Sequence, residues 1–160
     1  MNKGRQGIGP VTIGFAALCF LSSQALAQER FKTHGGFGGQ TVAVPVDKDH
    51  SMGYGVARGI VYNDAGNKMM DLATAACPYT VEIVGGAATF RGICTWTERG
   101  GDKIFTTWSS TFENGKGSGP QDVTGGTGKF SGVKGKIPFQ CTVLGTDQFE
   151  CSQEWEITTK

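Results

Sequence analysis

The cysteines of this 160-residue chain constrain its fold more than any other feature. Cys77 and Cys94 are equidistant from the glycines at 85 and 86, and Cys141 and Cys151 flank a second candidate turn symmetrically. Residues equidistant from the turn of an antiparallel hairpin face each other, so each pair can form a cross-strand disulfide. Four cysteines allow three pairings, and we predict Cys77 with Cys94 and Cys141 with Cys151. The pattern predicts a disulfide-stapled β protein.

The first 27 residues have the composition of a cleaved secretory signal. Two basic residues precede an apolar run at 11–21, which contains the fifth cysteine, and Ala25-Leu26-Ala27 follows it. The run is shorter than the roughly 18 apolar residues that cross a bilayer, so we expect a signal peptide rather than a transmembrane helix. The mature chain is predicted to begin at Gln28 and to be secreted or periplasmic, where disulfides form.

The mature chain is nearly neutral. The signal holds two of the 15 basic residues and no acidic residue, which leaves 13 basic residues against 14 acidic ones. Without a basic excess, the chain has no electrostatic footprint for nucleic acid or for an anionic membrane surface. No segment after the signal is apolar enough to be an integral membrane segment. The partner we expect is a small apolar or aromatic ligand, held by the predicted β fold.

The rest of the chain alternates short β-like segments with glycine-rich turns. Residues 28–40 are predicted to be a flexible leader because they contain His34-Gly35-Gly36-Phe37-Gly38-Gly39 and show no alternation. Residues 68–77 fit a helical turn or a strand, and residues 114–122 are predicted to be a mobile loop. The predicted strands are 41–46, 51–62, 80–84, 87–97, 103–112, 125–133, 136–144 and 148–158. This rhythm predicts one all-β domain at 41–160, either a sandwich or a closed antiparallel barrel of about eight strands.

The strand at 148–158 has the clearest alternation in the chain. Gln153 is the only polar residue on its otherwise apolar side, which consists of Phe149, Cys151, Trp155 and Ile157. The strand at 136–144 also has an apolar side, and this side includes Cys141. Pairing Cys141 with Cys151 makes the two apolar sides coincide, so register and disulfide support each other.

The strand at 51–62 offers the most interesting candidate site. Its bulky face carries Tyr54, Arg58 and Tyr62, and its other face is mostly glycine and alanine. If the bulky face pointed inward, Arg58 could hold a carboxylate or polarise a carbonyl in a dry cavity, and these three residues would bind ligand with Trp96 and Trp108. If it points outward, which we favour, Arg58 is an ordinary surface residue. The tryptophans are likewise ordinary core candidates that could also wall a ligand site.

The sequence contains no complete motif for a nucleotide site or a metal site. The segment around Gly128-Lys129 lacks the first glycine and the hydroxyl residue of a phosphate loop, and the third glycine of a dinucleotide fingerprint. The cysteine spacing does not suit a metal site, and His34 and His50 lie in a leader and a turn, away from the cysteines. We expect no metal, no nucleotide and no other cofactor, and we assign no catalytic residue.

Residues 122–135 contain the run Gly125-Gly126-Thr127-Gly128-Lys129-Phe130 and resemble the glycine-rich strand of the allene oxide cyclase and dirigent protein superfamily. The resemblance implies a closed, calycin-like barrel. It also implies a possible isomerase or cyclase activity without a cofactor, in which the cavity constrains a reactive intermediate. In the plant members the polar groups that act on substrate lie on other strands, and no position here matches them. The two predicted disulfides and the bacterial-type export signal depart from those members.

Together these observations predict a secreted or periplasmic barrel that binds a small hydrophobic or aromatic molecule. The alternative is an isomerase or cyclase of the allene oxide cyclase or dirigent type. A second alternative is a barrel packed solid by its own side chains that serves as a protein-interaction module.

Overall fold

A computed structural model describes residues 27–66 and 69–159 of the chain. The predicted signal at 1–27 lies outside the described residues except for Ala27, which begins the first strand. Within the described residues, no helix is long and apolar enough to cross a membrane.

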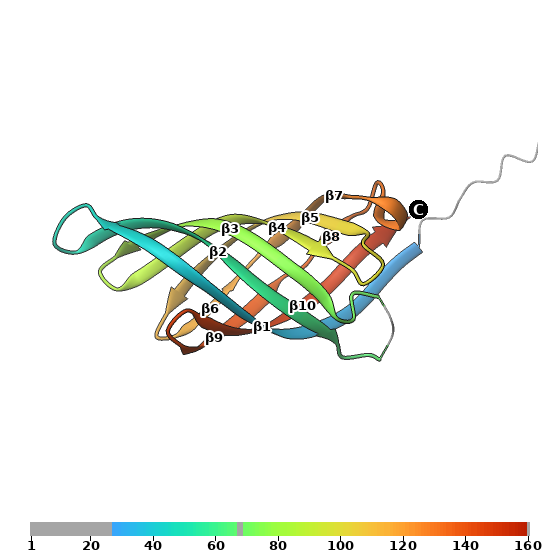
Figure 1. Cartoon of the computed structure of the whole chain (residues 1–160), viewed down its shortest axis with the longest axis horizontal. Coiled ribbons are helices and arrows are strands. Elements are labelled where there is room, and N and C mark those ends of the chain that lie inside the picture. The colour runs from blue at the N-terminus through green and yellow to red at the C-terminus, as the bar shows by residue number, and fades with distance from the viewer. Residues whose placement is uncertain (1–26, 67–68, 160) are drawn as a thin grey trace, which may run out of the picture.

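Ten strands in the described part of the chain form one antiparallel sheet that closes on itself (Figure 1). They are β1 (Ala27–Pro45), β2 (His50–Asn63), β3 (Ala73–Val84), β4 (Ala87–Thr97), β5 (Lys103–Glu113), β6 (Lys116–Gly119), β7 (Gln121–Gly126), β8 (Lys134–Lys136), β9 (Phe139–Gly145) and β10 (Gln148–Thr159). Strand β1 pairs with both β2 and β10, which closes the sheet. The couples β6–β7 and β8–β9 each act as one interrupted strand of the wall, which gives an eight-stranded barrel. The predicted closed barrel is confirmed.

Strand β1 corrects the prediction of a flexible leader at 28–40. Residues 27–38 pair with β10 and residues 33–45 pair with β2, so the segment is part of the barrel wall. Its glycines permit close contact between strands rather than disorder: a Cβ on Gly35 would lie 2.2 Å from the carbonyl oxygen of Ile60. The barrel therefore begins at residue 27 of the described chain instead of residue 41.

Both predicted disulfides are present. Cys77 in β3 is bonded to Cys94 in β4, and Cys141 in β9 is bonded to Cys151 in β10. The two Cα atoms of each pair are 4.1 Å apart, and Cys141 lies directly opposite Cys151 in the ladder. Each disulfide therefore joins neighbouring strands, as the symmetry about the turns predicts.

Two prolines interrupt the wall strands. The predicted mobile loop at 114–122 contains β6 and the start of β7, which Pro120 separates. The predicted strand at 136–144 is divided into β8 and β9 at Pro138. Proline has no N–H to donate to a ladder. The carbonyls are still used, because Pro120 accepts from the N–H of Ser109 and Pro138 accepts from the N–H of Glu154. Pro78, by contrast, lies within β3, and the ambiguous segment 68–77 therefore ends in strand.

The glycine-rich run at 125–130 closes one end of the barrel (Figure 1). The predicted strand at 125–133 ends at Gly126, and a short 3-10 helix, η1 (Gly128–Phe130), follows it. Gly128 has φ of 55°, and a Cβ there would lie 1.8 Å from Asp102 Oδ1. Asp102 also accepts a hydrogen bond from the N–H of Lys129. This turn buries Phe130 in the same core cluster as Ile104, so this end of the barrel is filled.

Candidate functional site

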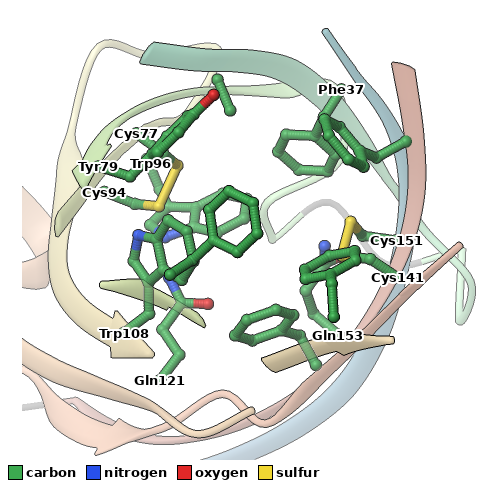
Figure 2. Close-up of a pocket in the computed structure, with 15 residues that line it drawn as sticks. Phe37, Cys77, Tyr79, Cys94, Trp96, Trp108, Gln121, Cys141, Cys151 and Gln153 are labelled. Atoms are coloured by element: carbon green, nitrogen blue, oxygen red, sulfur yellow. A yellow bond between two sulfur atoms is a disulfide. The ribbon is translucent and has the colours of Figure 1, made fainter. Parts of the chain in front are cut away.

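Beside this filled core the barrel contains a cavity with an almost entirely apolar lining (Figure 2). The space open to the centre of a water-sized sphere is about 80 Å³. By that measure it has room for about five to eight water molecules. Eight aromatic side chains, both disulfides, Ala57, Gln121 and Gln153 line it.

Glycines on neighbouring strands make room for the aromatic lining. At four positions an added Cβ would come within 2.8 Å of an inward ring, so the ring occupies the space above the glycine. The pairs are Phe37 over Gly59, Tyr79 over Gly55, Trp108 over Gly92 and Phe112 over Gly117. Strand β2 therefore turns its small face inward, because rings from β1 and β3 fill the space in front of it.

The orientation of β2 decides where the five predicted ligand-binding residues lie. Trp96 and Trp108 line the cavity. Tyr54 and Tyr62 are 61% and 42% exposed on the outer face of β2, and Arg58 lies on the same exposed face. The latter three residues therefore do not line the cavity, and Arg58 is a surface residue, as the favoured alternative expects.

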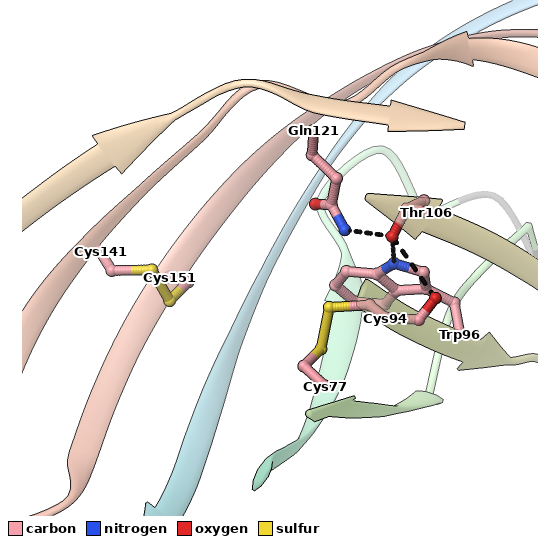
Figure 3. The surroundings of a disulfide bond; sticks show 7 residues. All are labelled: Cys77, Cys94, Trp96, Thr106, Gln121, Cys141 and Cys151. Carbon is pink, nitrogen blue, oxygen red and sulfur yellow. Dashed lines mark hydrogen bonds between the residues drawn. A yellow bond between two sulfur atoms is a disulfide. The ribbon is translucent and has the colours of Figure 1, made fainter. Parts of the chain in front are cut away.

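The first polar group of the cavity is a hydrogen-bonded set of Trp96, Thr106 and Gln121 (Figure 3). The Trp96 indole N–H donates to Thr106 Oγ1 at 3.2 Å, and Gln121 Nε2 donates to the same oxygen at 2.6 Å. The Thr106 hydroxyl in turn donates to the carbonyl of Cys94 at 3.5 Å. Thr106 and Gln121 are 1% and 3% exposed, so the set belongs to the barrel interior.

A second set repeats this arrangement on β1 and β10. The Trp155 indole N–H donates to Thr33 Oγ1 at 2.9 Å, and the Thr33 hydroxyl donates to Gln153 Oε1 at 2.6 Å. Trp155 packs edge to face against Trp96, with ring centroids 5.2 Å apart, so the two sets share one aromatic contact. Each glutamine is held by one atom of its amide and lines the cavity.

Charged groups are missing from the cavity lining. Among the described residues that form it there is no carboxylate, imidazole, ammonium or guanidinium group. The Tyr79 hydroxyl is hydrogen-bonded to Thr41 Oγ1 at 2.7 Å. The described residues also contain no group of three or more His, Cys, Asp or Glu side chains that could hold a metal ion. The cavity can thus orient a neutral molecule but offers no strong acid or base.

Of the two glutamines in the cavity lining, one can be predicted from the sequence pattern and the other cannot. Gln153 stands out as the polar residue on the apolar side of the last strand, which is the pattern expected for a polar group directed into a barrel. Gln121 lies between Pro120 and Asp122 in a stretch that reads as a loop, so no alternation reveals its direction. The pairing of β5 with β7, in which Gln121 lies opposite Trp108, brings it beside Thr106.

No family model matches the sequence, and no curated protein matches it. Solved structures do match, and two of them are dirigent proteins. The pterocarpan synthase dirigent protein PsPTS1 superimposes with a TM-score of 0.55 and 14% identity over 85% of this chain and 95% of that chain. The barrel has the dirigent fold. A second pterocarpan synthase dirigent protein, GePTS1, matches with a TM-score of 0.50 and 10% identity over 97% of each chain. At these identities the likeness concerns the fold alone, and the dirigent-type barrel of this chain has its own cavity lining.

Proposed function

We propose that this dirigent-type barrel encloses a small, uncharged aromatic molecule and fixes its orientation. The observation that carries the proposal is the cavity itself, which has aromatic walls and two glutamines whose amides are anchored at one atom only. Binding sites of this kind combine an apolar lining with a few placed polar groups.

The lining favours one class of guest. Rings that stack or meet edge to face with the walls gain more than their buried area alone provides. A charged guest would lose its hydration without meeting an opposite charge, which is costly in an apolar site. The preferred guest is therefore neutral and aromatic.

Coumarin provides a direct test of binding. Saturable quenching of tryptophan emission is expected, because Trp96 and Trp108 line the cavity. Ala57→Leu adds three carbons at the cavity wall and should weaken binding by tenfold or more. Arg58→Ala is the matched control, since this neighbour lies on the outer face, and its affinity should equal that of the wild type. Melting curves check that both variants fold. If coumarin and naphthalene both fail to saturate, or if Ala57→Leu binds normally, the proposal is wrong.

A second candidate function is a cyclase or isomerase of the dirigent type, favoured by the two pterocarpan synthase dirigent neighbours. The uncharged lining argues for a mechanism of constraint, in which the walls hold a reactive intermediate in one ring-closing conformation. A ring closure from an achiral precursor should then yield one enantiomer in excess with the wild type and a racemic product with Ala57→Leu. A racemic product with both proteins would contradict the cyclase function and leave ligand binding as the only proposed function.

We also propose that the protein is exported. The two disulfides are typical of an oxidising compartment and support the predicted signal. N-terminal sequencing of protein recovered from outside the cytoplasm should begin at Gln28. An intact N-terminus on that material would contradict the predicted cleavage.

A further inference from the structure

We propose that Gln121 and Gln153 select a guest that carries both a hydrogen-bond donor and a hydrogen-bond acceptor. Gln121 would accept from the guest and Gln153 would donate to it. This inference rests on the proposed binding of an aromatic molecule and adds which polar groups that molecule carries.

The orientation of the Gln121 side-chain amide follows from its hydrogen bond with Thr106. The Thr106 hydroxyl directs its single hydrogen at the carbonyl of Cys94, and its oxygen accepts from both Trp96 and Gln121. The nitrogen of the Gln121 amide faces Thr106. Its oxygen, Oε1, has no hydrogen bond to any described residue and points into the cavity (Figure 2). This atom can only accept.

The side-chain amide of Gln153 has the opposite orientation, with its oxygen toward the threonine. Thr33 Oγ1 also accepts a hydrogen bond from an indole N–H, that of Trp155. The Thr33 hydroxyl donates its own hydrogen to Gln153 Oε1. The oxygen of the Gln153 amide thus faces Thr33, and the described residues provide no hydrogen bond for its Nε2. This atom can only donate. Because Thr33 lies opposite Gln153 in the β1–β10 ladder, the backbone fixes this contact.

A purely structural role would leave half of each amide unexplained. Bracing the two threonines needs one amide atom per glutamine, and the other amide atom of each glutamine is left free to bind a guest. Gln121 and Gln153 are 3% and 2% exposed, yet both line the cavity with the unused atom. An acceptor from β7 and a donor from β10 therefore face the same apolar space. A guest with one hydroxyl and one carbonyl on an aromatic frame satisfies both.

Three probes separate the two hydrogen bonds: naphthalene has neither group, coumarin has an acceptor, and 7-hydroxycoumarin, kept below the pKa of its hydroxyl, has both. Dissociation constants are measured by tryptophan quenching for the wild type, Gln121→Leu and Gln153→Leu. Gln121→Leu should weaken the binding of 7-hydroxycoumarin about fivefold to tenfold and leave the affinity for coumarin unchanged. Gln153→Leu should weaken both coumarins by a similar factor. Naphthalene should bind all three proteins equally.

The outcomes distinguish this inference from the proposed function. If no probe saturates the wild type, the proposed binding fails and the inference fails with it. If naphthalene binds but Gln121→Leu affects all probes equally or none, the binding proposal stands and the selective role of the glutamines is overturned. Gln153→Leu leaves the Thr33 hydroxyl without its acceptor and can lower stability. The Gln121→Leu measurements decide the matter without it, because Thr106 keeps its bonds to Trp96 and Cys94.

Discussion

At the scale of single residues, the barrel depends on glycines that face inward beneath aromatic rings. Gly59 illustrates the arrangement, since a Cβ there would lie 2.4 Å from the Phe37 ring and 2.6 Å from the carbonyl oxygen of Gly36. A side chain at this position would have to displace both a cavity wall and the neighbouring strand. The glycine content of the chain is thus a packing requirement at these sites rather than a sign of disorder.

Gly59→Ala should therefore destabilise the protein by about 1 to 3 kcal/mol, the usual cost of overpacking a filled site. Gly36→Ala is the matched control on the paired strand, because nothing lies within 4 Å of its added Cβ. That variant should be neutral or slightly more stable. Guanidinium unfolding of the two variants measures the difference, and equal midpoints would contradict the packing argument.

At the scale of elements, β1 contributes most to closing the barrel. It pairs with β10 along residues 27–38 and with β2 along residues 33–45, so both of its edges are occupied where the two ranges overlap. A sheet without β1 would expose the edges of β2 and β10, and open edges favour aggregation.

Amide hydrogen exchange tests the place of β1. Amides of residues 33–37 should be protected to about the same degree as those of residues 151–155 in β10, because both segments are hydrogen-bonded within one closed sheet. Exchange at the rate of an unfolded peptide across 33–37 would show instead that the segment is a loose leader.

The same elements show what can be predicted from the sequence and why. The β10 pattern and the cysteine spacing predict register and disulfides, because alternation and symmetry about a turn are local properties. The strand rhythm leaves a sandwich or a barrel open, and the resemblance at 122–135 implies the closed barrel. The first part of β1, at 28–40, and β6 are missed because glycine at a close interstrand contact cannot be distinguished locally from glycine in a flexible segment. Gln153 interrupts a clear apolar face and can be found from the sequence. Gln121 follows a proline, and its direction is set by the pairing of β7 with β5.

At the scale of the whole molecule, the filled core and the candidate site adjoin and share Cys77, Cys94 and Trp96. The 3-10 turn at 128–130 and the core around Phe130 fill one end, while both disulfides lie in the cavity wall. A hollow region lacks the contacts that stabilise a filled core. The disulfides cross-link neighbouring strands in this region.

Removing one disulfide measures its contribution. Cys141→Ala with Cys151→Ala opens a link between residues ten apart in sequence, and the loss of stability should be about 3 kcal/mol from chain entropy. Unfolding in guanidinium without reductant gives the value. Unchanged stability of the double variant would show that the ladder alone holds β9 against β10.

The charge character of the cavity leads to a final prediction about the molecule as a whole. The described residues of the lining carry no charged group, so affinity for a neutral guest should not depend on counterions. Coumarin should bind with the same dissociation constant, within about twofold, at low and at high salt. Coumarin-3-carboxylate has nearly the same frame but brings a carboxylate that the lining cannot pair, so it should bind at least about tenfold more weakly. Equal binding of the acid, or salt-dependent binding of coumarin, would place the binding site on the charged outer surface instead of inside the barrel.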